Sequence, residues 1–209
     1  MATSKPSSAA QPGPREAGRL ATRARLLAAA VSSLIEIGVA RTTTLEVQRR
    51  AGASRGALLH HFPSHAQLLS ATVDELVRRN ERAVQRLTLR LRHHPDPVER
   101  AVLVLAATTA QPSFMAELEL WAVARTDADL RAALLDAERA HRQDIVRAFE
   151  LVFHPVSHLP GCANVMALTQ EFLLGLALSG VLRRRPARRR QLINQWVAAA
   201  RLLLHQAPG

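Results

Sequence analysis

Residues 43–62 read TTLEVQRRAGASRGALLHHF, and this stretch decides how the first third of the 209-residue chain folds. Thr43 or Thr44 can cap a short helix, because a threonine hydroxyl accepts a hydrogen bond from a free backbone N–H of the first turn. Two apolar residues of this helix are expected to face inward, Leu45 and Val47. Ala51-Gly52 ends the helix, since glycine adopts the positive φ that a tight turn needs.

A second short helix follows the turn. Ser54 can cap its start, and the helix ends near Phe62 because Pro63 disfavours helical backbone at the preceding residue. Two short helices joined by a tight turn form a helix-turn-helix, which presents its second helix to the major groove of DNA. Arg55 is suited to a bidentate contact with guanine. Four neighbouring residues also suit DNA binding. The small residues Gly56 and Ala57 allow the helix to approach DNA closely, and Arg49 and Arg50 can neutralise phosphates.

The segment Gly52-Ala53-Ser54-Arg55-Gly56 also has the G-x-S-x-G spacing that places a serine nucleophile in many hydrolases. A nucleophile elbow needs a buried strand before the serine. Here the preceding segment is helical, and the chain has 3% aromatic residues, no tyrosine and no alternating strand pattern. The helix-turn-helix is therefore favoured over a catalytic serine. An ordinary helical hairpin with a solvated arginine face stays an alternative.

Helical periodicity continues through the rest of the chain. Asp96, Pro97 and Glu99 stand as N-cap, N1 and N3 of one helix, which Gln111-Pro112 is expected to end. Thr126 is expected to cap a later, long helix. The predicted helices cover residues 20–37, 43–50, 54–62, 64–92, 97–111, 113–125, 126–153, 162–180 and 186–205. The predicted fold class is all-α, with about nine helices.

The chain is strongly basic, with 28 lysines and arginines against 17 acidic residues and a formal net charge of +11. Residues 1–65 hold nine of the basic residues and three of the acidic ones. This balance indicates a polyanionic partner, either nucleic acid or an anionic membrane surface. A second basic run, RRRPARRR at 183–190, fits such a patch or a solvated loop between two helices, and we expect the loop.

No segment points to export or to a membrane span. Every apolar run is expected to be broken by charge before the roughly 20 residues that a span needs. Residues 1–18 lack the apolar core of a secretory signal and are predicted to be a disordered basic tail. A single cysteine, Cys162, excludes an intrachain disulfide and fits a reducing compartment. We therefore expect a soluble cytoplasmic protein.

Residues 26–76, LLAAAVSSLIEIGVARTTTLEVQRRAGASRGALLHHFPSHAQLLSATVDEL, resemble the amino-terminal DNA-binding domain of the TetR family of transcriptional regulators. The shared pattern is a helix ending in glycine, Thr-Thr opening the second helix, Ala-Gly at the turn, Ser-x-Gly opening the third, and His-Phe before a polar cap. The resemblance implies a helix-turn-helix DNA-binding domain over 19–65 and a helical effector-binding and dimerisation domain over 66–209.

The resemblance also assigns the DNA contacts. The recognition residues would be Ser54, Arg55, Gly56, Ala57, Leu59, His60 and His61, flanked on the backbone by Thr43, Thr44 and His65. His60 and His61 point to different faces, so only one is expected to reach DNA, and Phe62 is expected in the core. The family usually has tyrosine at the place of Leu59 and lysine at the place of His65, which weakens two phosphate contacts. Arg49, Arg50, Arg55 and the basic tail are expected to compensate.

The same resemblance implies a pocket for a small-molecule effector in the helices between residues 64 and 153. Arg125 continues an apolar face of the helix over 113–125, and His141 lies within the apolar stripe of the helix over 126–153. Each polar group is either a pocket residue or a core residue with a partner, and Glu138 and Asp144 are candidate partners. The predicted pocket residues are Phe114, Met115, Leu118, Trp121, Arg125 and His141, although the aromatic and methionine side chains also fit a plain core.

The last two helices carry more apolar surface than one side of a monomer core uses. The resemblance implies a four-helix dimer interface through Phe172, Leu176, Ser179, Ile193, Trp196 and Ala200. Alternatively, the helix over 162–180 is simply central to its domain.

The sequence therefore predicts a homodimeric transcriptional regulator, most simply a repressor that leaves a palindromic operator when an effector binds. We expect neither catalysis nor a cofactor. No metal site is expected either, because Pro63 and Pro155 interrupt the two candidate histidine pairs, His61/His65 and His154/His158. A hydrolase using Ser54 and a basic membrane-surface protein are the competing hypotheses.

Overall fold

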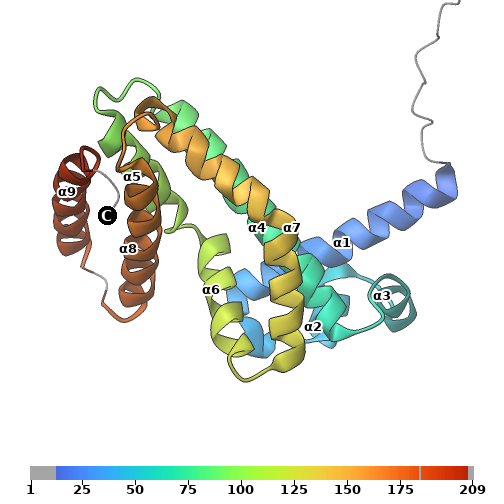
Figure 1. Ribbon diagram of the computed structural model, residues 1–209. Coiled ribbons are helices and arrows are strands. Elements are labelled where there is room, and N and C mark those ends of the chain that lie inside the picture. Colours follow the sequence, from blue (N-terminus) through green and yellow to red (C-terminus); the bar gives the residue numbers. More distant parts are fainter. Residues whose placement is uncertain (1–12, 184, 207–209) are drawn as a thin grey trace, which may run out of the picture.

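The computed structural model describes residues 13–183 and 185–206, and within these ranges all regular secondary structure is helical (Figure 1). The predicted all-α fold is confirmed. The elements are α1 (Pro14–Ile37), η1 (Val39–Arg41), α2 (Thr44–Ala51), α3 (Arg55–His61), α4 (His65–Arg90), α5 (Pro97–Thr108), α6 (Pro112–Ala124), α7 (Ala128–Phe153), η2 (His154–Val156), α8 (Cys162–Leu182) and α9 (Pro186–Leu203). Nine of these are α-helices, and η1 and η2 are single 3-10 turns.

Most helix starts follow the capping residues in the sequence. Side-chain oxygens of Thr43, Ser54, Ser64 and Asp96 each accept a hydrogen bond from the backbone N–H three residues later. Two predictions were wrong. Asp127, not Thr126, caps α7, because its carboxylate accepts from the N–H of Leu130. Gln111-Pro112 begins α6 rather than ending α5, since proline at N1 removes an N–H that would be unpaired anyway.

The first helix is longer than predicted. It begins at Pro14, so residues 14–18, expected in the disordered tail, are helical, while residues 1–12 lie outside the described part of the chain. Residues 13–21 are all exposed, and this end of α1 projects away from the molecule (Figure 1). Leu20 is 45% exposed, and the buried residues of α1 begin at Leu26.

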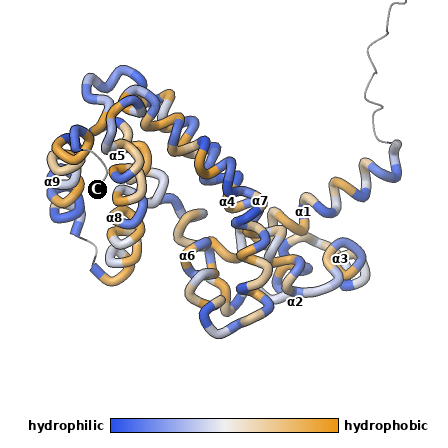
Figure 2. The backbone as a smooth tube through the Cα atoms, in the orientation of Figure 1, coloured by the Kyte–Doolittle hydropathy of each residue, from blue (hydrophilic) through white to orange (hydrophobic). Residues whose placement is uncertain are grey.

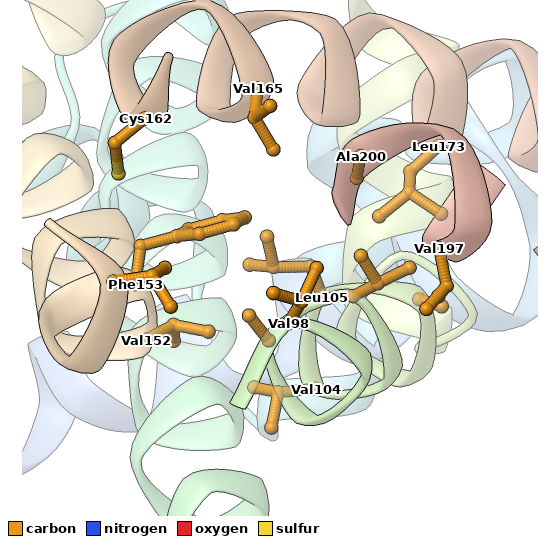
Figure 3. Packing of buried hydrophobic residues seen from close by; sticks show 14 of the residues in the cluster. Val98, Val104, Leu105, Val152, Phe153, Cys162, Val165, Leu173, Val197 and Ala200 are labelled. Carbon is orange, nitrogen blue, oxygen red and sulfur yellow. The ribbon is translucent and has the colours of Figure 1, made fainter. Parts of the chain in front are cut away.

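Three groups of buried side chains make up the core, and α4 contributes to all of them. The first joins α1, α2 and α3 through residues such as Leu26, Val47, Leu58 and Leu68. The second joins α1, α4, α6 and α7. The third, shown in Figure 3, gathers side chains of α5, α7, α8 and α9 around Phe153. The α4 helix therefore connects the helix-turn-helix end of the molecule to its carboxy-terminal end.

The α8 helix has only one charge to interrupt its apolar run. It contains one charged residue, Glu171, and by length and composition it could cross a membrane. Core helices of soluble proteins pass the same test, and one face of α8 packs inside the fold through Val165, Thr169, Leu173 and Ala177. Much of α8 is hydrophobic along its length (Figure 2), and on its other face Leu168, Leu178, Val181 and Leu182 are all more than 40% exposed.

The basic run at 183–190 is mostly helix rather than the expected loop. Pro186 occupies N1 of α9, and residues 186–190 form its first turns. Arg189 is half-buried, and its Nη2 donates to the Ala106 carbonyl oxygen of α5 at 2.7 Å. Arg184 lies outside the described residues. Part of this run therefore fastens α9 to α5.

Candidate nucleic-acid interface and ligand cavity

The turn between α2 and α3 has the geometry that the sequence predicts. Gly52 has φ +59° and ψ +39°, a left-handed conformation that ends α2. The Ser54 hydroxyl accepts a hydrogen bond from the Ala57 N–H at 3.2 Å and so caps α3. A helix precedes Ser54, and no strand occurs among the described residues. Ser54 is therefore a helix cap and lacks the strand-to-helix setting of a nucleophile elbow.

The α3 helix separates a buried face from an exposed one. Leu58 and, just after the helix, Phe62 are buried in the first core group, as predicted for Phe62. Ser54, Arg55, Gly56, Leu59 and His60 are exposed, and Leu59 is 43% exposed. The exposed side chains therefore form one face that is free to meet DNA.

His60 and His61 differ in environment, as expected from their positions. His60 is exposed, whereas His61 is half-buried. Burial lowers the pKa of His61, and the positive charges of His60, Arg19 and Arg23 lower it further. His61 is accordingly neutral at pH 7, and His60 is the better placed of the two for a contact with DNA.

Arg49 and Arg50 of α2 have different surroundings. Arg50 has a side chain only 20% exposed and pairs with Glu36 of α1 at 2.6 Å as well as with Glu46. Arg49 also bonds Glu46, at 2.8 and 2.9 Å, but its side chain is 70% exposed. Hydrogen bonds from both arginines lower the pKa of Glu46 to about 2. Arg50 therefore joins α2 to α1, and of the two arginines only Arg49 is exposed toward solvent.

One further prediction near α2 was wrong, and His65 makes a contact that was not predicted. Leu45 does not face inward but is 73% exposed, because residues two apart on a helix point to nearly opposite sides and Val47 takes the buried one. His65 Nε2 lies 3.2 Å from the backbone carbonyl oxygen of Thr42, so the imidazole links α4 to the loop before α2. Thr43 is exposed and Thr44 half-buried at the same edge.

The exposed end of α1 adds a feature that the sequence analysis missed. Arg15, Arg19 and Arg23 are spaced by four and are all exposed. The guanidinium of Arg23 lies 5.1 Å from the centre of the Phe62 ring, at the end of α3. This basic arm therefore extends the positively charged surface beside the helix-turn-helix, and the four-residue spacing was the signal.

A cavity of about 550 Å³ lies among α4, α5, α6, α7 and α8. Three of the predicted pocket residues line it, Phe114, Trp121 and Arg125. The other three, Met115, Leu118 and His141, are not among its lining residues. Much of the wall is apolar, including Val77, Val84, Leu105, Leu134, Ile145, Phe149 and Leu173. The arrangement fits a compact, largely apolar molecule.

A buried carboxyl group in the wall of this cavity was not predicted. Glu117 of α6 is 9% exposed, and burial raises its pKa to about 7. Asn80 of α4 donates from Nδ2 to Glu117 Oε2 at 2.8 Å, and the Ser113 hydroxyl donates to Asn80 Oδ1 at 2.6 Å. A glutamate within the apolar segment SFMAELELWAVA was the available signal. These hydrogen bonds join α4 to α6 and place a polar group in the wall of the cavity.

His141 is a partnered residue at the interface of α4 and α7, the second of the two roles considered for it. Its Nδ1 lies 3.3 Å from Asp144 Oδ2, and its Nε2 lies 3.2 Å from Asp74 Oδ1. Asp144 was a predicted partner, whereas Asp74 was not, because it lies on a different helix. Glu138, the other candidate partner, lines the cavity instead.

The predicted dimer residues divide into two groups. Ile193 and Ala200 are buried against the monomer's own core, so they are not available to a partner. Trp196 stacks on Phe172 at 5.4 Å and donates from Nε1 to Thr169 Oγ1 at 3.0 Å, and Leu176 is half-buried. Ser179 is exposed. The unpartnered apolar surface of these helices consists instead of Leu168, Leu178, Val181 and Leu182 of α8 and Leu202 of α9.

Comparison with known proteins connects this geometry to a family. Residues 26–72 match the family described as bacterial regulatory proteins, tetR family. An uncharacterised HTH-type transcriptional regulator of Mycobacterium tuberculosis H37Rv is 30% identical over 156 residues, which are 74% of this chain and 76% of that protein.

Solved structures share the fold. A transcriptional regulator from Rhodococcus sp. RHA1 superposes with a TM-score of 0.62 at 20% identity, covering 89% of this chain and 99% of that one. The multidrug binding protein EbrR, solved with imidazole, gives a TM-score of 0.55 at 17% identity over 83% of this chain and 93% of that one. With its helix-turn-helix and its relatives, the chain belongs to the TetR family, whose members are DNA-binding transcriptional regulators rather than enzymes.

Proposed function

We propose that this protein is a repressor that binds a palindromic operator as a homodimer and leaves it when a small molecule occupies the cavity. The cavity of about 550 Å³ is the observation that carries the proposal. Its walls include α4 and α6, and both helices also contact the helix-turn-helix end of the molecule. A bound molecule can therefore bias the position of the DNA-binding helices. A regulator of this kind acts in the cytoplasm, where its operator lies.

For the DNA contacts, we propose that α3 enters the major groove. Arg55 is exposed at its first turn and is the candidate for a guanine contact, with His60 on the same exposed face. Backbone contacts would come from the edge of α2 and the start of α4, through Thr43, Thr44, Arg49 and His65. Ser54, Gly56, Ala57, Leu59 and His61 complete the proposed surface, and Arg50 is left out because Glu36 and Glu46 already pair with it.

For the dimer, we propose that the exposed apolar face of α8 packs against the same face of a second copy. Leu178 is 65% exposed and Leu182 is 89% exposed, and burying such side chains is the main favourable term in association. A twofold dimer would present two α3 helices to successive major grooves, about 34 Å apart. This spacing is the reason to expect a palindromic operator.

For release, we propose that the effector prefers a dimer whose recognition helices no longer match that spacing. Glu119 of α6 accepts a hydrogen bond from the Val39 N–H at 2.8 Å, so a movement of α6 reaches the end of α1 directly. EbrR shares the fold and is described as a multidrug binding protein, which supports an apolar small molecule as the effector class.

The test is capture of genomic DNA fragments by the full-length protein, followed by quantitative binding to the best fragment. We expect a short palindromic sequence to be preferred over bulk DNA. Arg55→Ala should weaken that preference while the oligomeric state is unchanged. Arg139→Ala, an exposed arginine on α7, is the matched control and should bind as the wild type does. Equal affinity for the captured sequence and for bulk DNA would contradict the proposal.

A further inference from the structure

A cluster of ionisable side chains lies between α4 and α7, away from the DNA-binding face. His141 contacts Asp144 of its own helix through Nδ1 at 3.3 Å and Asp74 of α4 through Nε2 at 3.2 Å. Glu81 lies two helical turns beyond Asp74. One potential ligand atom from each of Glu81, His141 and Asp144 lies within 4.8 Å of the other two, and all three residues are half-buried. Because α4 and α7 run side by side here (Figure 1), packing fixes the backbone of the cluster.

Glu81 is not explained by the fold. Its Oε1 atom is buried and has no hydrogen-bond partner among the described residues. A buried carboxylate oxygen is unfavourable unless a donor or a cation meets it. The structure thus leaves an oxygen in the cluster that lacks a partner.

Glu81 is the carboxylate of the cluster that has no partner. Asp74 and Asp144 both contact His141, and Arg147 forms an ion pair with the second oxygen of Asp144. The arginines that follow Asp74 on α4, Arg78, Arg79 and Arg82, all pair with Glu75. Among the described residues, no hydrogen bond or ion pair reaches Glu81, so its carboxylate is the one that a cation would meet.

We propose that Glu81, His141 and Asp144 bind a divalent first-row transition-metal ion such as Zn²⁺, with Asp74 as the residue that orients His141. An imidazole ligand beside carboxylates favours such ions over Mg²⁺ and Ca²⁺, which prefer oxygen alone. If the Nε2–H of His141 donates to Asp74, the Nδ1 lone pair faces Asp144 and the ion. A carboxylate–histidine–metal arrangement of this kind fixes the tautomer of the ligand histidine.

The site is reachable from solvent. A surface hollow of about 450 Å³ is lined by Glu81, Asp144 and Arg147. It offers an entry path and room for a water molecule as the fourth ligand, as in open zinc sites. Zinc–ligand distances of about 2.0–2.2 Å place tetrahedral ligand atoms roughly 3.4 Å apart, so the three ligand atoms, which lie within 4.8 Å of one another, would have to move together around the ion.

The proposed site departs from the expectation of no metal site, and the reason is topological. The histidine pairs considered in the sequence are four residues apart, whereas this cluster forms only when α4 and α7 pack together. The proposal does not depend on the repressor hypothesis, because metal binding can be measured without DNA or an effector.

The experiment is titration of the chelator-treated, full-length protein with Zn²⁺ by calorimetry, and with Co²⁺ by visible absorption. We expect one ion per chain. Glu81→Gln and His141→Gln should each weaken Zn²⁺ binding at least tenfold and change the cobalt spectrum. Asp74→Asn should weaken it about 10- to 100-fold, as loss of an orienting partner does, while the spectrum keeps its shape. His158→Ala and Asp136→Asn, both exposed, are the controls and should match the wild type.

Absence of one-to-one binding would overturn the proposal. So would Zn²⁺ binding that Glu81→Gln and His141→Gln leave unchanged, because the ion would then occupy exposed histidines elsewhere. If His141→Gln fails to fold, the nearly isosteric Glu81→Gln and its cobalt spectrum decide. Competition by millimolar Mg²⁺ would also count against the site, since Mg²⁺ prefers oxygen ligands and would not require the imidazole of His141.

Discussion

At the scale of single residues, DNA binding restricts the side chain at position 56 more than folding does. A Cβ built on Gly56 would meet nothing nearer than the Ser54 hydroxyl, at 4.0 Å, and the residue is exposed on α3. The free protein therefore has room for a side chain. A methyl group on this face would, however, stand between α3 and the floor of the major groove.

Gly56→Ala should accordingly separate stability from DNA binding. We expect stability to stay the same or rise by up to about 1 kcal/mol, because alanine loses less backbone entropy in a helix. Affinity for the captured operator should fall at least tenfold. Denaturant unfolding and fluorescence anisotropy measure the two quantities. Gly18→Ala, at another exposed helical glycine with nothing within 4 Å of an added Cβ, is the matched control for the stability change. An unchanged operator affinity would remove Gly56 from the interface.

Glu117 makes stability depend on pH. Its pKa in the folded protein is raised to about 7, from an ordinary value of 4.5, chiefly by burial. The unfolded chain therefore releases this proton first as the pH rises. The contribution to stability is complete below about pH 4.5 and is lost as the pH rises through about 7.

Glu117→Gln should remove this pH dependence. Between pH 5 and pH 8 the wild type should lose up to about 3 kcal/mol more of its free energy of unfolding than the variant does. Glutamine keeps an oxygen that accepts from Asn80, so the hydrogen-bond chain survives. Guanidinium titrations at both pH values provide the measurement. Parallel losses in the two proteins would mean that Glu117 is ionised in the folded state at low pH.

At the scale of elements, the arm of α1 should act through charge alone. Arg15 and Arg19 are exposed, and Arg23 lies against Phe62 beside α3. Each phosphate that a basic residue neutralises releases counterions, which makes binding salt-dependent.

Replacing Arg15, Arg19 and Arg23 by glutamine should reduce the slope of log K against log salt by up to about 3. Sequence preference should be retained, because phosphate contacts carry no base information. Arg139, Arg142 and Arg147 on α7 offer a triple control of the same charge. A slope equal to that of the control would place the arm away from DNA. Arg49 and the residues before Pro14 would then have to compensate for the phosphate contacts weakened at Leu59 and His65.

Sequence patterns predicted local features of the elements better than their surroundings. Ser54 as a cap, Gly52 as a left-handed turn and Asp96-Pro97 as a helix start depend on neighbouring backbone, so the sequence contains the whole signal. Pairing across helices is not local. The ion pair of Arg50 with Glu36 depends on which helices pack together, and so does the burial of Ile193 against the monomer core. The amount of apolar surface on α8 and α9 indicated a partner but could not say which face a second copy would cover.

At the scale of the whole molecule, the exposed face of α8 carries the dimer proposal. Leu178→Glu places a charge at its centre, so association should be lost at concentrations where the wild type is a dimer, because a buried unpaired charge is costly. Operator affinity should also fall, because each monomer then binds a single half-site without its partner. Leu89→Glu is the matched control: Leu89 on α4 is 64% exposed, against 65% for Leu178. Light scattering after gel filtration measures the mass. A Leu178→Glu protein that is still a dimer would exclude this face as the dimer interface.

Communication between the cavity and the DNA-binding end should pass through Glu119. This residue lies on α6, which also carries the cavity residues Glu117 and Trp121. Its carboxylate accepts from the Val39 N–H at 2.8 Å, and a Cβ on Gly38 would come within 2.8 Å of it, so the contact is close. The joint therefore fixes the end of α1 relative to α6.

Glu119→Ala should loosen this joint without touching DNA. We expect faster hydrogen exchange at the Val39 amide and an operator affinity lower by about fivefold, the lower end of typical coupling between sites. Glu119→Gln should stay close to the wild type, because its amide oxygen still accepts from Val39. If alanine and glutamine variants bind the operator equally, the hydrogen bond transmits nothing, and the packing of α4 through all three core groups is left as the physical connection between cavity and recognition helix.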